Sequence, residues 1–248
     1  MRIQVDLHVH TVASGHAFST VMEIAREASM RGLRAVGISD HGPALPGGPH
    51  MYHFSALRFL PRTMEGVRIL RGVEANLVNE KGGMDLPGEI LSRLDYAMVG
   101  FHEGCGLRAS NPKKNTRTLV AAMETGKVRV ITHPENAAFP VDVPAVVRAA
   151  RDLSVAIEVN NSSFNQSRSG SYVSSSEFAA EAARAGAPIC LSSDAHVACQ
   201  IGQVDDAWKV ASAAGVQPDQ VVNRTLEGLL RFLDLEEGGP PRRSQTLR

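Results

Sequence analysis

Short β-branched apolar runs alternate along most of the chain with longer segments rich in Ala, Leu, Arg and Glu. This alternation is typical of βα units and not of all-β sandwiches. The apolar runs predict seven strands, at Ile3–Val9, Leu33–Ser39, Val67–Ala75, Asp95–Phe101, Val128–Thr132, Ser154–Val159 and Ala187–Ser192. Helical apolar spacing predicts helices at Thr20–Arg31, Thr116–Thr125, Val143–Arg151, Ser175–Ala185 and Asp205–Ala214. Gly32, Gly126 and Gly186 follow three of these helices, where a left-handed cap is needed.

Alternating strands and helices with right-handed crossovers form either an open doubly wound sheet or a closed barrel. We expect a closed barrel, because the candidate ligands described below lie at six strand ends and only a closed ring brings six ends to one point. No repeat, low-complexity block or interdomain linker precedes residue 236. Residues 1–235 are therefore predicted to form a single domain, and residues 236–248 a flexible tail.

Charge and cysteine content narrow the possible partners and compartment. The 26 Lys and Arg residues balance 26 Asp and Glu residues, which argues against a surface built for nucleic acid or an anionic membrane. Three scattered cysteines without a C-x-x-C spacing suit a reducing cytosol. No apolar run is long enough for a membrane helix, and no signal peptide precedes the first strand. We expect a cytoplasmic protein; the sequence does not indicate its oligomeric state.

Seven of the nine histidines lie near the C-terminal end of a predicted strand. His8 and His10 stand at i and i+2 on strand one, so both imidazoles point the same way, and His16 follows six residues later. The other candidate positions are Asp40 and His41, Glu74, His102, His133, and Asp194 with His196. A single histidine at a strand end is ordinarily a hydrogen-bonded loop residue. Six such ends meeting at the C-terminal mouth of a barrel, where active sites lie, predict a metal site.

Counting ligands predicts how many ions this site holds. Seven histidines, one glutamate and one aspartate fill the coordination of two zinc ions, because zinc takes about four to five ligands. Three ions leave positions for water and substrate, and imidazole-rich sites suit zinc, with manganese or iron as substitutes. The surplus positive charge attracts a phosphate dianion, and neighbouring ions generate hydroxide at neutral pH. The sequence thus predicts hydrolytic phosphoryl transfer with a metal-bound hydroxide as the nucleophile.

Six motifs carry a family resemblance: Asp6-Leu7-His8-Val9-His10-Thr11, Asp40-His41-Gly42-Pro43, Gly72-Val73-Glu74-Ala75-Asn76, Gly100-Phe101-His102-Glu103, Asn160-Asn161-Ser162-Ser163-Phe164 and Ser193-Asp194-Ala195-His196. In this order they resemble the polymerase and histidinol phosphatase (PHP) superfamily, and most closely its YcdX-type phosphatases, over about residues 3–235. The resemblance implies a distorted (β/α)7 TIM-like barrel with three zinc ions that hydrolyses small phosphomonoesters.

The resemblance also implies a ligand set for each ion. His8, His10, Glu74 and Asp194 would hold the first ion. Glu74 would bridge to a second ion held with His102 and His133, while His16, His41 and His196 would hold the third.

Other polar residues are candidates for binding substrate or for catalysis. Asn160, Ser162, Ser163 and Arg168 follow strand six and are expected to hydrogen-bond a phosphate, Arg168 in bidentate fashion. Glu74, Asp194 and Asp40 are the candidate catalytic carboxylates, and Asp40 would either orient a ligand or protonate the leaving alkoxide. Asp6 is expected to orient an imidazole from below.

Three alternatives remain open. A metal-dependent amidohydrolase also begins with H-x-H, but that class uses a carbamylated lysine on a middle strand, and strand four here ends in His102 with no lysine before Lys113. A phosphodiesterase or exonuclease would need a basic track for a nucleic-acid strand, which the sequence lacks. A non-catalytic metal-binding module is the third alternative, and the intact set of ligands weighs against it.

Overall fold

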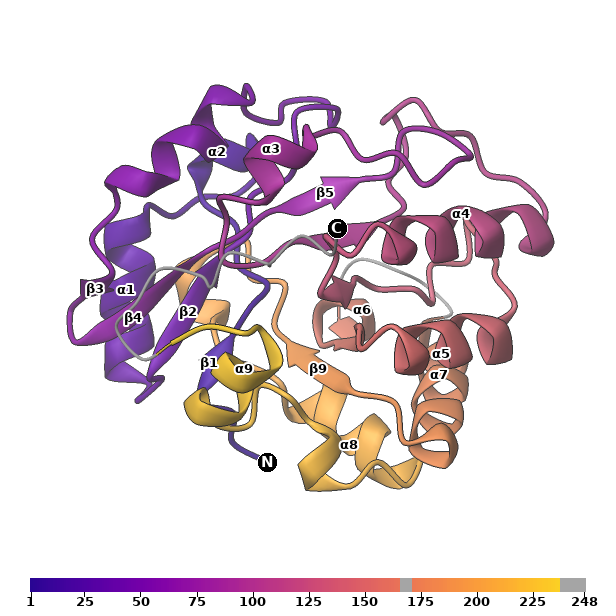
Figure 1. Ribbon diagram of the computed structural model, residues 1–248. Helices are drawn as coiled ribbons and strands as arrows, with labels where there is room; N and C mark the ends of the chain where they lie inside the picture. Colours follow the sequence, from indigo (N-terminus) through magenta and orange to yellow (C-terminus); the bar gives the residue numbers. More distant parts are fainter. Residues whose placement is uncertain (166–170, 237–248) are drawn as a thin grey trace.

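The computed structural model describes residues 1–165 and 171–236, and its strands form two hydrogen-bonded sheets (Figure 1). The first sheet has the order β1 (Val5–Asp6), β2 (Ala35–Ile38), β4 (Val67–Arg71) and β3 (Thr63–Met64). The second runs β5 (Glu74–Asn76), β6 (Met98–Gly100), β7 (Val130–Ile131), β8 (Ala156–Asn160) and β9 (Ile189–Ser192). Neighbouring strands are parallel except β3 and β4. The strands therefore follow the sequence order expected of βα units.

Two seams join these sheets into a closed barrel. At one seam, β4 and β5 are consecutive parts of the predicted strand Val67–Ala75, and Glu74 pairs with His41 beyond the end of β2. At the other, the His10 amide donates to the Ala195 carbonyl at 2.9 Å, and the Ala195 amide donates to the His8 carbonyl at 3.2 Å. The expected distorted (β/α)7 barrel is confirmed, and its distortion lies where one predicted strand splits in two.

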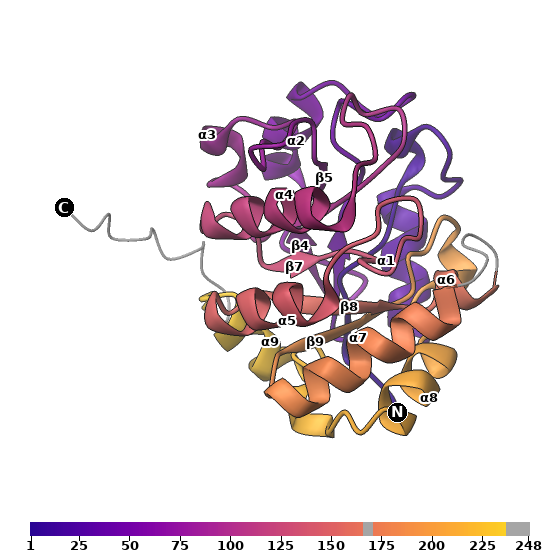
Figure 2. The ribbon, with the colours of Figure 1, turned by 90° about the vertical axis from the view of Figure 1, so that its right-hand side faces the viewer.

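Helices cover the outside of the barrel. The five predicted helices are present as α1 (Val21–Met30), α4 (Pro112–Glu124), α5 (Val143–Asp152), α7 (Ser171–Ala185) and α8 (Asp205–Ala213). Figure 2 shows α4, α5 and α7 side by side on this outer surface. Gly32, Gly126 and Gly186 have positive φ, as their predicted cap positions require. None of the helices in the described ranges is long and apolar enough to span a bilayer.

Short helices escaped the sequence prediction because few turns leave little periodicity to detect. They are α2 (Tyr52–Ala56), α3 (Gly88–Leu91), α6 (Ser162–Asn165), α9 (Leu226–Phe232) and the 3-10 turns Val12–Ser14, Leu57–Phe59, Ala198–Gln200 and Pro218–Gln220. The prediction also began α4 four residues late. The Asn111 side chain accepts from the Lys114 amide and Pro112 occupies the first turn, so the helix begins at Pro112.

The core has two parts, one under the outer helices and one inside the barrel. The inner part takes residues from all seven strand positions, from α9 and from the residues that follow it: Val5, Leu7, Ala35, Leu70, Tyr96, Met98, Val130, Ala156, Cys190, Leu226, Leu229, Leu230, Leu233 and Leu235. A Cβ on Gly37 or Gly72 would overlap the Tyr96 side chain, so these glycines make room for its ring. Helix α9 therefore closes the N-terminal end of the barrel with leucines, and the C-terminal end is left for polar groups.

Candidate metal centre

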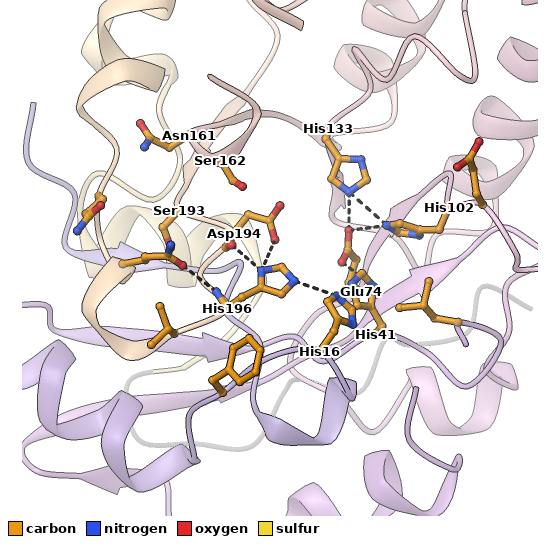
Figure 3. Close-up of a pocket in the computed structure, with 16 residues that line it drawn as sticks. His16, His41, Glu74, His102, His133, Asn161, Ser162, Ser193, Asp194 and His196 are labelled. Carbon is orange, nitrogen blue, oxygen red and sulfur yellow. Dashed lines mark hydrogen bonds and ion pairs between the residues drawn. The ribbon is translucent and has the colours of Figure 1, made fainter. Parts of the chain in front are cut away.

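The nine predicted ligands converge at the C-terminal end of the barrel around Glu74. Figure 3 shows those that line the adjoining cavity: His16, His41, Glu74, His102, His133, Asp194 and His196. Glu74 begins β5 and is fully buried. Its Oε2 lies 3.1, 3.5 and 2.9 Å from ring nitrogens of His8, His10 and His41. Its Oε1 lies 2.9 Å from His133 Nε2 and 3.2 Å from His102 Nε2. A single carboxylate therefore contacts five imidazoles that come from different parts of the chain.

Asp194 is the second carboxylate of the cluster and follows β9 in a left-handed conformation, with φ 53°. Its Oδ1 lies 3.4 Å from His8 Nε2 and 3.2 Å from His10 Nε2. The sharp backbone turn directs this side chain back toward β1. Asp194 thereby places a second negative charge beside the first two histidines.

His16 and His196, which we call the outer pair, direct their Nε2 atoms toward each other and form a candidate position for a cation. The Nδ1 of His16 bonds to the Ser14 carbonyl and the Nδ1 of His196 to the Asp194 carbonyl, each at 3.0 Å. A carbonyl only accepts, so in both neutral rings the proton sits on Nδ1 and Nε2 carries a lone pair. These two Nε2 atoms face each other at 3.0 Å. Facing lone pairs repel, and a positive ion bound by both nitrogens removes the repulsion.

His8 and His10 are oriented in the same way by deeper groups. His8 Nδ1 donates to Glu158 Oε1 at 2.6 Å. Ser14 Oγ donates to the Asp40 carboxylate at 2.7 Å, so its oxygen is free to accept from His10 Nδ1 at 3.2 Å. The two Nε2 atoms are buried and have no hydrogen-bond partner among the described residues. Their lone pairs and the nearby carboxylate oxygens form the donor set of a divalent cation.

Electrostatics supports this assignment. Burial raises the pKa of Glu74, but His8, His41 and His102 outweigh it and hold that pKa well below its ordinary value. Burial lowers the pKa of His8, yet Glu74, Glu158 and Asp194 together raise it well above its ordinary value. The site therefore favours positive charge at His8 Nε2, which a proton or a metal ion can supply. Burial and then the charge of His41 lower the pKa of His10 to about 3, which keeps that ring neutral.

Three groups of side chains place their ligand atoms within 4.8 Å of one another: His8, His10 and Asp194; His41, Glu74 and His102; and His10, His41 and His196. The first group belongs to the set expected for the first ion. His41 lies with Glu74 and His102 in one group and with His10 and His196 in another, and His10 also belongs to two groups. The three spatial groups thus share His10 and His41. The assignment of each residue to one ion is part of the proposal below.

Asp40 is oriented by four donors. Its carboxylate accepts from the Thr11 amide at 2.7 Å, from the Thr11 and Ser14 hydroxyls, and from His53 Nε2 at 3.0 Å. Burial raises the pKa of Asp40, but the hydrogen bonds from His53 and Ser14 outweigh it and lower the pKa to about 2. An ionised carboxylate has no proton to give to an alkoxide. The structure therefore favours the orienting role for Asp40 over the proton-donor role.

Asp6 holds a loop instead of an imidazole. Its Oδ2 accepts from Ser193 Oγ at 2.5 Å and from the Gly202 amide at 2.8 Å. Val5 and Leu7 face the apolar interior, so the alternation of strand one breaks before His8, and Asp6 does not share the face of the two histidines. Asp6 therefore does not contact an imidazole ring as expected: its Oδ1 accepts from the His8 amide at 3.3 Å, so it holds the backbone of His8 and the segment that carries Asp194.

A cavity of about 740 Å³ opens beside the cluster. Its described lining outside the ligands consists of Phe18, Leu45, Glu103, Asn161, Ser162, Ser193, Val197, Gln200 and Gln203. Of the four residues expected to bind phosphate, Ser162 lines the cavity and Ser163 is buried. Asn160 is fully buried and donates to Asp194 Oδ2 and Glu158 Oε2, both at 3.1 Å, so it points into the ligand support and not toward substrate. Arg168 lies outside the described residues.

Glu158 is a buried neighbour of the candidate ligands that the sequence prediction missed. The six strand ends with predicted ligands do not include strand six, yet Glu158 of this strand contacts both His8 and the backbone of His133. The available signal was a charged residue in the apolar run Val155-Ala156-Ile157-Glu158-Val159. A carboxylate in a buried strand needs partners, and here the partners are ligands.

The chain is similar to known proteins over nearly its whole length. A model of the PHP domain family matches residues 6–233. A probable phosphatase of Syntrophotalea carbinolica is 44% identical over 235 residues, covering 95% of this chain and 98% of that protein. One from Shewanella amazonensis is 46% identical over 233 residues, 94% of this chain and 92% of its own. The histidinol phosphate phosphatase of Lactococcus lactis, crystallised with zinc, L-histidinol and phosphate, has a similar fold: TM-score 0.55, 14% identity, coverage 86% and 94%.

Proposed function

Because this chain belongs to the PHP domain family, we propose that it is a metal-dependent phosphatase that hydrolyses small phosphomonoesters at the rim of its barrel. The observation that carries the proposal is the convergence of imidazole lone pairs on two ionised carboxylates. That arrangement is unfavourable alone and favourable around cations. Two relatives with more than 40% identity, each named a probable phosphatase, support the same reaction class.

The donor set fits three divalent ions. His8, His10, Asp194 and Glu74 would hold one, Glu74 with His102 and His133 a second, and His16, His41 and His196 a third. Seven imidazoles favour zinc, with manganese or iron as substitutes, and zinc is the metal present in the Lactococcus lactis structure. Such ions, when bound, polarise phosphoryl oxygens and activate water at neutral pH.

The residues around the ligands keep them ready to bind. Glu158 and Ser14 hold the Nδ1 protons of His8 and His10, and Asn160 and Ser193 hold the segment of Asp194 and its partner Asp6. These hydrogen bonds orient the side chains before an ion or a phosphate binds. Preorganised groups of this kind lower the cost of stabilising charge in the transition state.

The cavity suits the organic part of a phosphorylated metabolite. Its volume of about 740 Å³ falls within the range of small-molecule sites. Phe18, with 78% of its surface exposed, and Leu45 supply apolar contacts at the opening. Asn161 and Ser162 add polar side chains to its lining. We therefore propose a monoester with a partly apolar organic group as substrate.

A substrate panel tests the proposal. Protein loaded with zinc or manganese is assayed with p-nitrophenyl phosphate, bis-p-nitrophenyl phosphate and a p-nitroanilide amide. Hydrolysis of the monoester in preference to the other two, abolished by chelation, is the expected result. Faster hydrolysis of the diester would favour the phosphodiesterase alternative, and hydrolysis of the amide alone would favour an amidohydrolase. Metal binding without hydrolysis of any of the three substrates would favour the alternative of a non-catalytic metal-binding module.

A further inference from the structure

Glu158 of β8 is fully buried behind the metal centre, and four donors from three neighbouring strand ends and from its own strand surround it. His8 Nδ1 donates to Oε1 at 2.6 Å, and the Ser192 hydroxyl donates to the same oxygen. The His133 amide donates to Oε2 at 2.6 Å, and Asn160 Nδ2 donates to Oε2 at 3.1 Å. Glu158 therefore lies beneath two imidazoles of the cluster, one held by its ring and the other by its backbone.

The two oxygens of Glu158 face different kinds of partner. Both partners of Oε2 can only donate: the His133 amide is a backbone N–H, and the Asn160 side chain is fixed because its Oδ1 accepts from the Ser162 amide at 2.9 Å. On the Oε1 side, the Ser192 hydroxyl can turn to donate or accept, and His8 Nδ1 can carry a proton or a lone pair. Only the Oε1 side is adaptable.

We propose that Glu158 is a positioning residue that fixes the tautomer of His8. A carboxylate accepts at both oxygens, so it satisfies both fixed donors and also holds the proton of His8 on Nδ1. The lone pair of His8 is thereby directed from Nε2 toward Glu74 Oε2 at 3.1 Å and Asp194 Oδ1 at 3.4 Å. The consequence for metal binding rests on the proposed metal centre; the tautomer itself does not.

The conservative substitution Glu158→Gln should reverse this arrangement. The two fixed donors claim the amide oxygen, so the amide NH2 turns toward Ser192 and His8. His8 Nδ1 must then accept, which moves the proton to Nε2, where it points at Glu74 and Asp194 and takes the place of a cation. The amide has the size and shape of the carboxylate it replaces, so packing is preserved and the expected defect is specific to hydrogen-bond direction. Substitution of outer partners of ligating histidines typically weakens metal affinity about 10–100-fold.

The experiment compares the full-length wild type with Glu158→Gln and with the matched control Ser192→Ala, which removes a donor to the same oxygen but leaves the acceptor for His8. Zinc affinity is measured by competition with a chromophoric chelator. The protonated nitrogen of His8 is identified in long-range proton–nitrogen spectra recorded with equal added zinc, and the signal is assigned by its loss in His8→Gln. We expect Glu158→Gln to bind one ion about 10–100-fold more weakly with its His8 proton on Nε2. The control should keep the proton on Nδ1 and wild-type affinity.

Two outcomes would overturn the inference: a Glu158→Gln variant with wild-type zinc affinity and its proton on Nδ1, or a wild-type protein whose His8 proton sits on Nε2. The second result decides the question even if Glu158→Gln fails to fold. A wild type with the Nδ1 proton but no phosphatase activity would contradict the proposed function and leave this inference standing. The two proposals can therefore fail separately.

Discussion

The two ends of the barrel are built from the same strands but depend on different physics. At the N-terminal end, Leu70, Ala156 and their neighbours meet the leucines of α9 in an apolar plug. At the C-terminal end, Glu74 and Glu158 continue the same strand positions with buried charge. Apolar burial stabilises the fold whatever is bound, at about 25 cal/mol per Å². Buried carboxylates and imidazoles cost desolvation energy, which only their partners and bound cations recover.

This contrast teaches where stability and function reside. The apolar end needs shape and no ligand, so its substitutions should lower stability and leave metal binding intact. The polar groups at the C-terminal end need a cation among their lone pairs. Substitutions of these groups should therefore remove metals and leave the protein folded. The following predictions test this separation, from the largest expected effect to the smallest.

Glu74→Gln should give the largest effect, at the polar end. Glu74 is a proposed ligand of two of the three ions, so an amide there should release two of three metal equivalents. Phosphatase activity should fall by at least about 100-fold, the upper value for outer-shell partners, because Glu74 is itself a proposed ligand. Elemental analysis and monoester hydrolysis measure both effects. Glu89→Gln, on the exposed side of α3, is the matched control, and three retained equivalents in Glu74→Gln would refute the bridge.

Acidification to about pH 5 should release the metals and leave the barrel folded. Glu74 has a lowered pKa, so its stabilising pairs persist above its ordinary value of 4.5 and are lost below it. His8 has a raised pKa, so its contribution is fully present below 6.5 and is lost as the pH rises through its folded value. At a pH between 4.5 and 6.5, Glu74 is ionised and a proton on His8 Nε2 replaces the cation beside Glu74.

Metal content and circular dichroism after dialysis at about pH 5 and pH 7.5 check this separation. Unchanged metal content at pH 5 would contradict histidine ligation. Loss of the fold together with the metals would contradict the independence of the two ends.

Leu229→Ala should act on the apolar end alone. Leu229 is fully buried between α9 and the strands, so the cavity left behind should cost about 2–5 kcal/mol. The midpoint of thermal unfolding should fall by roughly 4–20 °C, with metal content unchanged. Leu153→Ala, at a position 40% exposed, provides the control and should barely shift the midpoint. Metal loss in folded Leu229→Ala would show that the ends are coupled.

Gly72→Ala should have the smallest effect and tests the boundary between the ends. Its Cβ would overlap the Tyr96 ring, whose hydroxyl donates to the Leu7 carbonyl at 2.5 Å. The displaced ring should cost about 1–3 kcal/mol, measured by chemical denaturation. Gly88→Ala, which meets nothing within 4 Å, is the matched control. Equal stability of the two variants would mean that Tyr96 does not fill the barrel tightly.

Strand and ligand positions were the most predictable parts of the protein. The seven strand positions and five longer helices followed from apolar periodicity, and the histidines stood out because they recur at strand ends. Apolar periodicity did not predict the short helices, the split between β4 and β5, or the leucine plug of α9. Each of these depends on contacts between distant segments. Asn160 was expected to bind phosphate because it follows a strand, but its side chain donates to Glu158 and Asp194 instead.

The sequence by itself determined the donor inventory: which side chains could bind metals, and that alternating strands would carry them to one rim. It could do so because residue chemistry and periodicity are local properties. Only the tertiary structure decided which nitrogen of each imidazole faces the centre, because that choice belongs to acceptors far away in sequence, such as Glu158 behind His8. The tautomer of each imidazole is set by residues that lie close to it in space, and in a closed barrel those residues are distant in the sequence.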